Sequence, residues 1–74
     1  MTLREALLEA ARRLEAAGIE GAAGDARALL TEAVGIARDR LTLHLGDELE
    51  PGAAVRFAAL IARREAREPV AKIL

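Results

Sequence analysis

Apolar residues recur at steps of three and four positions in three separate stretches of the chain, and glycine or proline stands between these stretches. This spacing gathers apolar side chains on one face of an α-helix, whereas a half-buried strand shows alternation. At 74 residues the chain is one domain at most, and a domain of this size buries only roughly 60% of its unfolded surface. We therefore expect an all-α fold, a small helical bundle of four to five helices, in a single domain over residues 1–74.

The first helix has clear signals at both ends. Thr2 followed three residues later by Glu5 fits a capping box, which predicts that a helix begins there. Gly18 is suited to the left-handed position that closes a helix. The apolar face expected between them consists of Leu3, Leu7, Leu8, Ala11 and Leu14.

A second apolar stripe predicts a helix from the region of Gly21 and Gly24 to Val34. Gly24 would cost up to ~1 kcal/mol relative to alanine inside the first turn, so we expect the helix to begin nearer Asp25 than Gly21. A carboxylate near this end is favoured by the helix dipole. The members of the stripe are Ala22, Ala26, Leu29, Leu30 and Ala33.

Residues 36–45 have two interpretations. Leu41, Leu43 and Leu45 alternate as they would in a strand, whereas residues 38–40 resemble the start of a short helix after a turn. A single strand would leave its backbone groups unpaired, and no other part of the chain could serve as its partner. We predict a short helix.

The longest helix is predicted to begin at Pro51, because proline lacks the N–H that would be unpaired in the first turn. Pro69 should end this helix near Arg67 and open a last short turn over residues 70–74. The expected buried face consists of Ala54, Phe57, Ala58, Leu60 and Ile61.

Most catalytic chemistry is excluded by residue types that the chain lacks: it has no Ser, Cys, Tyr, Trp, Asn or Gln. His44 is the only histidine, and a single histidine among leucines is more often a packed or half-exposed side chain than a metal ligand. Asp47, Glu48 and Glu50 are best explained as a solvated turn ahead of a helix. We therefore predict no catalytic, cofactor-binding or metal-binding residue in this chain.

The net charge and the absence of cysteine limit the partners and the cellular compartment that we expect for this chain. The net charge is −1 and charges of both signs are interspersed, which argues against a nucleic-acid partner for the whole domain. Without cysteine nothing requires an oxidising compartment, and no apolar stretch approaches the ~20 residues of a membrane span. We expect a cytoplasmic protein with no membrane partner.

The chain has one local group of basic residues, formed by Arg56, Arg63, Arg64 and Arg67. These arginines could meet an acidic surface of a partner protein, and they are the candidate partner-binding residues. The alternative is a solvated helix face on which arginine is favoured near the C-terminal end by the helix dipole.

Four sequence pieces together carry a resemblance to a known family. They are Asp25-Ala26-Arg27-Ala28-Leu29-Leu30, then Val34-Gly35, then Arg38-Asp39-Arg40-Leu41-Thr42-Leu43-His44, and finally the arginine-rich helix that runs into Glu68-Pro69-Val70-Ala71-Lys72-Ile73-Leu74. Over essentially its whole length the chain resembles the N-terminal domain of the release factor glutamine methyltransferases, the PrmC/HemK family.

The resemblance implies a five-helix domain attached to a C-terminal Rossmann-like catalytic domain that uses S-adenosylmethionine. That enzyme methylates N5 of the glutamine in the Gly-Gly-Gln motif of class 1 peptide chain release factors, and the N-terminal domain is expected to help dock the release factor. The alternative is a structural bundle that orients or stabilises the catalytic domain. The family's Asn-Pro-Pro-Tyr signature and glycine-rich cofactor loop do not occur here, so this chain alone is expected to be non-catalytic.

Overall fold

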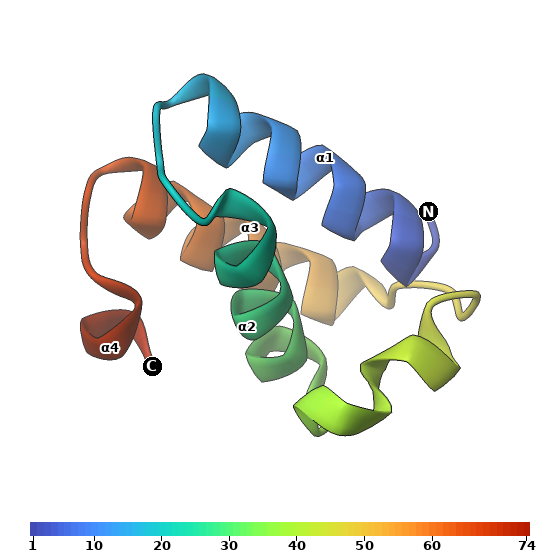
Figure 1. Ribbon diagram of the computed structural model, residues 1–74. Helices are drawn as coiled ribbons and strands as arrows, with labels where there is room; N and C mark the ends of the chain where they lie inside the picture. Colours follow the sequence, from blue (N-terminus) through green and yellow to red (C-terminus); the bar gives the residue numbers. More distant parts are fainter.

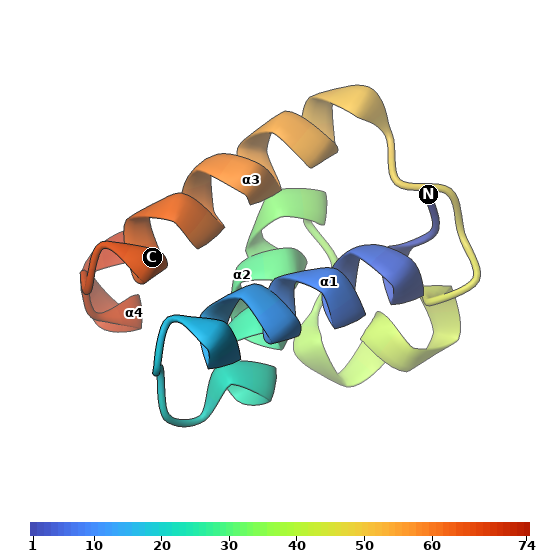
Figure 2. The same ribbon diagram turned by 90° about the horizontal axis from the view of Figure 1, so that it is seen from above.

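The computed structural model describes all 74 residues and contains five helices and no strand. The helices are α1 (Leu3–Ala16), α2 (Ala22–Val34), the 3-10 helix η1 (Arg38–His44), α3 (Pro51–Glu65) and α4 (Val70–Ile73). Helices α1 and α3 run in the same direction, and α2 crosses and contacts both (Figures 1 and 2). The prediction of an all-α bundle of four to five helices is confirmed. None of the helices combines the length and apolar character needed to cross a membrane.

Helix α2 is the centre of the core. All five residues of its predicted stripe are buried, and Ala28 and Thr31 are buried as well because α2 is contacted on more than one side. The Thr31 hydroxyl donates to the Ala28 carbonyl over 2.8 Å, so its burial leaves no unpaired side-chain group.

The start of α2 differs from the prediction. It begins at Ala22 instead of near Asp25, and Gly21 precedes it in a left-handed conformation with φ 69°. Burial of Ala22 in the core explains why the first turn forms despite Gly24. A Cβ placed on Gly24 would meet no atom within 4 Å, so packing within the chain does not require glycine at this position.

Both ends of α1 follow the sequence signals. The Thr2 hydroxyl accepts from the Glu5 N–H (3.2 Å), and the Thr2 N–H donates to the Glu5 carboxylate (2.8 Å), which is the predicted capping box. At the other end Gly18 has φ 78°, and the Ile19 N–H donates to the Leu14 carbonyl over 3.0 Å. This is a Schellman ending that also buries Ile19, a core residue that the helical spacing did not predict.

The buried face of α1 is rotated from the predicted one. Leu3 and Leu14 are buried as expected, but Ala6 and Ala10 complete the face. The assignment of Leu8 to it was wrong, since Leu8 is 51% exposed. Leu8 follows Leu3 by five positions, about 140° around a helix of 3.6 residues per turn, which points it away from α2.

A short helix forms within residues 36–45, as predicted: it is η1 (Arg38–His44), and it is of the 3-10 type. Leu41 is fully buried, whereas Leu43 is exposed, so the alternation of leucines does not mark a strand. The segment after it covers the start of α1, because the carbonyls of Asp47 and Leu45 accept the N–H groups of Leu3 and Arg4, each over 2.9 Å. These bonds satisfy donors that have no partner inside α1.

Helix α3 begins at Pro51 as predicted and ends at Glu65. Phe57 and Ile61 are buried and contribute to the core. The assignment of Ala58 to the buried face was wrong: it is exposed, and Ala53 is buried instead. The reason is tertiary, because α3 packs mainly on α2, and its Ala58 side borders a hollow next to α1.

Candidate partner-binding site

Two of the four candidate arginines bind the C-terminal ends of neighbouring helices. Arg56 Nε donates to the carbonyl of Ala33 at the end of α2 over 3.1 Å. Arg67 Nη2 donates to the carbonyl of Ala17, the residue that caps α1, over 2.7 Å. These carbonyls carry the negative end of each helix dipole, so a guanidinium group is well suited to them.

The other two candidate arginines pair with carboxylates. Arg63 Nε lies 2.5 Å from the Glu68 carboxylate. Arg64 Nε lies 2.9 Å from the carboxylate of Asp25 on α2, and its Nη1 donates to the Glu68 carbonyl over 3.1 Å. The Asp25 and Arg64 side chains are only 24% and 20% exposed, so this pair joins the start of α2 to the end of α3 with little screening.

The structure therefore brings the candidate arginines to separate partners within the fold. Each has at least one bond to its own chain, and Arg67 also occupies a left-handed conformation with φ 75° at the end of α3. A guanidinium group has five N–H donors, and these bonds use one or two of them. Contact with a partner protein through these residues stays a prediction.

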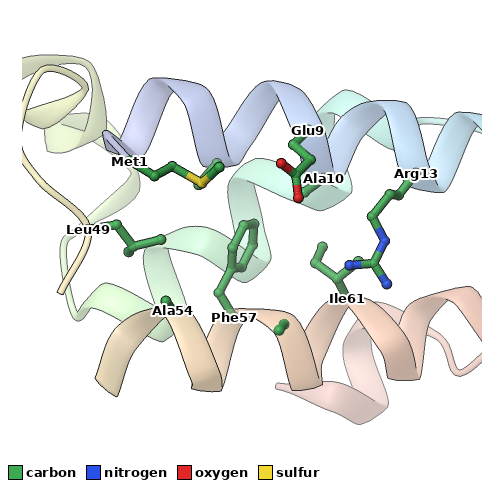
Figure 3. Close-up of a pocket in the computed structure, with 10 residues that line it drawn as sticks. Met1, Glu9, Ala10, Arg13, Leu49, Ala54, Phe57 and Ile61 are labelled. Atoms are coloured by element: carbon green, nitrogen blue, oxygen red, sulfur yellow. The ribbon is translucent and has the colours of Figure 1, made fainter. Parts of the chain in front are cut away.

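An apolar groove lies between α1 and α3 (Figure 3). Its volume is about 190 Å³, and eight of its ten lining residues are apolar. Phe57 projects from α3 towards α1, and Met1 and Leu49 lie at one end of the hollow (Figure 3). The lining residues are Met1, Ala6, Glu9, Ala10, Arg13, Leu49, Ala54, Phe57, Ala58 and Ile61.

Charged groups lie at the other end of this groove. Arg13 binds Glu65 through two hydrogen bonds, Nη2 to Oε1 at 2.6 Å and Nε to Oε2 at 3.2 Å. The bond to Glu65 raises the pKa of the Arg13 guanidinium, and partial desolvation opposes this shift. Glu9 lies beside this pair and takes part in no ion pair or side-chain hydrogen bond.

The groove was not predicted from the sequence. It forms because small residues of α1, Ala6 and Ala10, face the only aromatic residue of the chain, Phe57. Two alanines across from one phenylalanine leave space that larger side chains would fill. The signal in the sequence was the pair of alanines at i and i+4 on the core face of α1.

Two carboxylates of the acidic turn before α3 pair with other groups of the chain. His44 is half-buried, and its Nδ1 lies 2.9 Å from the Asp47 carboxylate. The Glu48 carboxylate lies 3.3 Å from the N-terminal amine. No three His, Cys, Asp or Glu side chains are grouped in a way that could hold a metal ion.

The hollows of the chain are too small for S-adenosylmethionine. The three that the structure contains have volumes of about 190 to 200 Å³, whereas small-molecule sites typically measure about 300 to 1,000 Å³. None is lined by a glycine-rich loop. The residues present do not fit the methyl donor, and we derive no reaction step from this chain.

Comparison with known proteins identifies the family of this chain. The sequence model described as the PrmC N-terminal domain matches residues 5–74. The chain belongs to the PrmC N-terminal domain family. It is similar to the release factor glutamine methyltransferase of Cereibacter sphaeroides, with 54% identity over all 74 residues of the chain and 27% of the relative.

Two further relatives carry the same description. The release factor glutamine methyltransferase of Moorella thermoacetica is 49% identical over 95% of the chain and 25% of the relative. That of Deinococcus radiodurans is 40% identical over the same shares. This PrmC N-terminal domain thus spans about a quarter of the length of these enzymes, and no solved structure gave a significant match.

Proposed function

We propose that residues 1–74 are the docking domain of a larger, cytoplasmic methyltransferase that acts on class 1 peptide chain release factors. Membership of the PrmC N-terminal domain family supports this proposal, as do the names of the relatives. The reaction is N5-methylation of the glutamine in the Gly-Gly-Gln motif, with S-adenosylmethionine as methyl donor. The catalytic domain that follows in such an enzyme supplies that chemistry, and this domain supplies binding energy for the protein substrate.

The groove between α1 and α3 is the observation that carries the proposal. Its apolar floor and charged rim match the usual anatomy of a protein interface, in which an apolar centre is surrounded by polar groups. Its volume exceeds the about 150 Å³ of an engineered cavity that binds benzene, so it can take one large apolar side chain. We infer that an apolar residue of the release factor covers Phe57.

The candidate arginines have a secondary part in this proposal. Arg63 is exposed on α3 and retains free N–H donors beside its bond to Glu68. Arg56, Arg64 and Arg67 retain donors in the same way. An acidic stretch of the release factor could accept from them without displacing the bonds that hold the helices together.

Two alanines of α3 provide a matched test. Ala58 and Ala59 are both exposed, but only Ala58 lines the groove. Ala58→Glu places a charge beside Phe57 and should weaken binding of a purified class 1 release factor to the chain about tenfold, as measured by calorimetric titration. Ala59→Glu should leave the affinity unchanged. Equal affinities for the two variants would exclude the groove as the binding site for the release factor. Absence of binding by the unaltered chain would contradict the docking function itself.

A structural role is the second candidate, and the arginine bonds favour it. Arg56, Arg64 and Arg67 join α3 to α1 and α2, which is what a domain that only supports a catalytic domain would need. Photo-crosslinkers placed along α3 separate the two functions. Docking predicts crosslinks to the release factor, whereas a purely structural bundle predicts none.

A further inference from the structure

Gly24 is not explained by the fold of the chain. It lies within α2, where glycine is less favourable than alanine, and its φ is not in the left-handed region. A Cβ at this position would meet nothing within 4 Å. Glycine is useful where a ligand must approach the backbone closely, so the surroundings of Gly24 are informative.

Gly24 lines a hollow of about 200 Å³ between α2 and η1. Two arginines, Arg27 of α2 and Arg38 of η1, line the same hollow, which also borders the buried residues Ala28 and Leu41. The remaining lining residue, Thr31, already uses its hydroxyl hydrogen in the bond to the Ala28 carbonyl. The accessible lining of the hollow therefore comes mainly from Arg27, Arg38 and Gly24.

Neither arginine is neutralised within the chain. Each of the four candidate arginines, and Arg13 of α1, makes a hydrogen bond to a carboxylate or a carbonyl. Arg27 and Arg38 make no ion pair and no side-chain hydrogen bond. Asp25, which precedes Arg27 by two positions, is paired with Arg64 instead.

We propose that this hollow binds a carboxylate of an acidic segment on a partner protein. A guanidinium group can bind a carboxylate through two N–H donors, and two arginines with no partner within the chain line this hollow. The interspersed charges and net charge of −1 disfavour nucleic acid as the source of the anion.

The site is independent of the proposed groove. The groove is lined by α1, α3 and the residues that precede them, whereas this hollow is lined by α2 and η1. A partner other than a release factor could bind in this hollow, and a titration with an acidic peptide tests the site without a release factor.

A blocked hexapeptide of alternating glutamate and alanine is a suitable probe for titration of the ¹⁵N-labelled chain by NMR at low salt. We expect saturable shifts at residues 24, 27 and 38. Arg27→Gln and Arg38→Gln should each weaken binding roughly fivefold. Arg12→Gln is the matched control, because Arg12 is exposed on α1, has no partner and lies outside the hollow, and it should leave the affinity unchanged.

Gly24→Ala separates binding from folding. It should raise the midpoint of thermal unfolding and weaken binding of the peptide, because the methyl group favours the helix and fills part of the hollow. A glutamine peptide should produce no saturable shift. The proposal is overturned if the glutamate peptide binds Arg27→Gln and Arg38→Gln as tightly as it binds the unaltered chain, or if inorganic phosphate at matched ionic strength binds more tightly than the peptide.

Discussion

Arg67 occupies a left-handed backbone conformation, with φ 75°, that glycine adopts without steric cost. The position closes α3 in the way that Gly18 closes α1, since the N–H of Glu68 donates to the Arg63 carbonyl and the N–H of Arg67 to the Arg64 carbonyl. An arginine is tolerated there because its side chain reaches the Ala17 carbonyl over 2.7 Å. The bond to α1 thus offsets a local backbone penalty.

At this position the glycine variant should be more stable than the alanine variant, the reverse of the usual order inside a helix. Arg67→Ala loses the bond to Ala17 and keeps the backbone penalty, so it should lower the free energy of unfolding by about 1 kcal/mol. Arg67→Gly loses the same bond but relieves the penalty, so its stability should lie near that of the unaltered chain. Urea denaturation measures both, and an alanine variant more stable than the glycine variant would contradict this account.

Glu5 should contribute to the pH dependence of stability. Hydrogen bonds from the Thr2 N–H and then from the Thr2 hydroxyl hold the pKa of the Glu5 carboxyl below its ordinary value near 4.5. A group with a lowered pKa in the folded state stabilises the fold above its unfolded pKa, and this contribution is lost as pH falls through the folded value.

Glu5→Gln should therefore be less stable than the unaltered chain at pH 7, with the difference shrinking as the pH falls below about 4.5. Thermal unfolding, followed by circular dichroism between pH 7 and pH 2, measures this difference in stability. Glu9→Gln is the control, because Glu9 accepts no hydrogen bond and lies one turn further along α1. A constant difference across this pH range would show that Glu5 makes no such contribution.

At the scale of helices, local signals determined what could be predicted. The capping box at Thr2, the left-handed Gly18 and the prolines at 51 and 69 act through the backbone of their own turn, and each fulfils its predicted role. Leu8 and Ala58 were misplaced because burial depends on where the neighbouring helix packs. The start of α2 was misplaced because burial of Ala22 outweighs the intrinsic cost of Gly24.

Gly24→Ala should stabilise α2 by up to about 1 kcal/mol, since the new methyl group meets no atom and glycine is the poorer helix former. Gly21→Ala should have the opposite effect, with a loss of about 1 kcal/mol, because Gly21 has φ 69°. Chemical denaturation of the two variants measures both changes. Destabilisation by Gly24→Ala would mean that the glycine is required by the fold.

At the scale of the whole molecule, a single aromatic residue joins the core to the groove. Phe57 is 5% exposed and belongs to the core cluster, yet it also lines the hollow between α1 and α3. Sequence spacing could place it on the buried face of α3, but the hollow beside it depends on Ala6 and Ala10 of another helix. The candidate arginines illustrate the same limit, because the helix ends that Arg56 and Arg67 bind are distant in sequence.

Phe57→Ala should lower the free energy of unfolding by about 3 kcal/mol, the low end of the range for buried phenylalanine, because one side of the ring borders an open hollow. Val55→Ala on the same helix is the control: Val55 is 71% exposed, and the change should stay within about 0.5 kcal/mol. A loss below about 1 kcal/mol for Phe57→Ala, measured by chemical denaturation, would mean that the aromatic ring adds little to the core.

Steady-state kinetics of the proposed full-length methyltransferase test the docking role most directly, with release factor and methyl donor varied in turn. We expect Ala58→Glu to raise KM for the release factor about tenfold while kcat and KM for S-adenosylmethionine stay unchanged, which marks a loss of substrate binding alone. Ala59→Glu should match the unaltered enzyme. An unchanged KM for the release factor together with a lower kcat would contradict docking and indicate that the domain acts by supporting the catalytic domain.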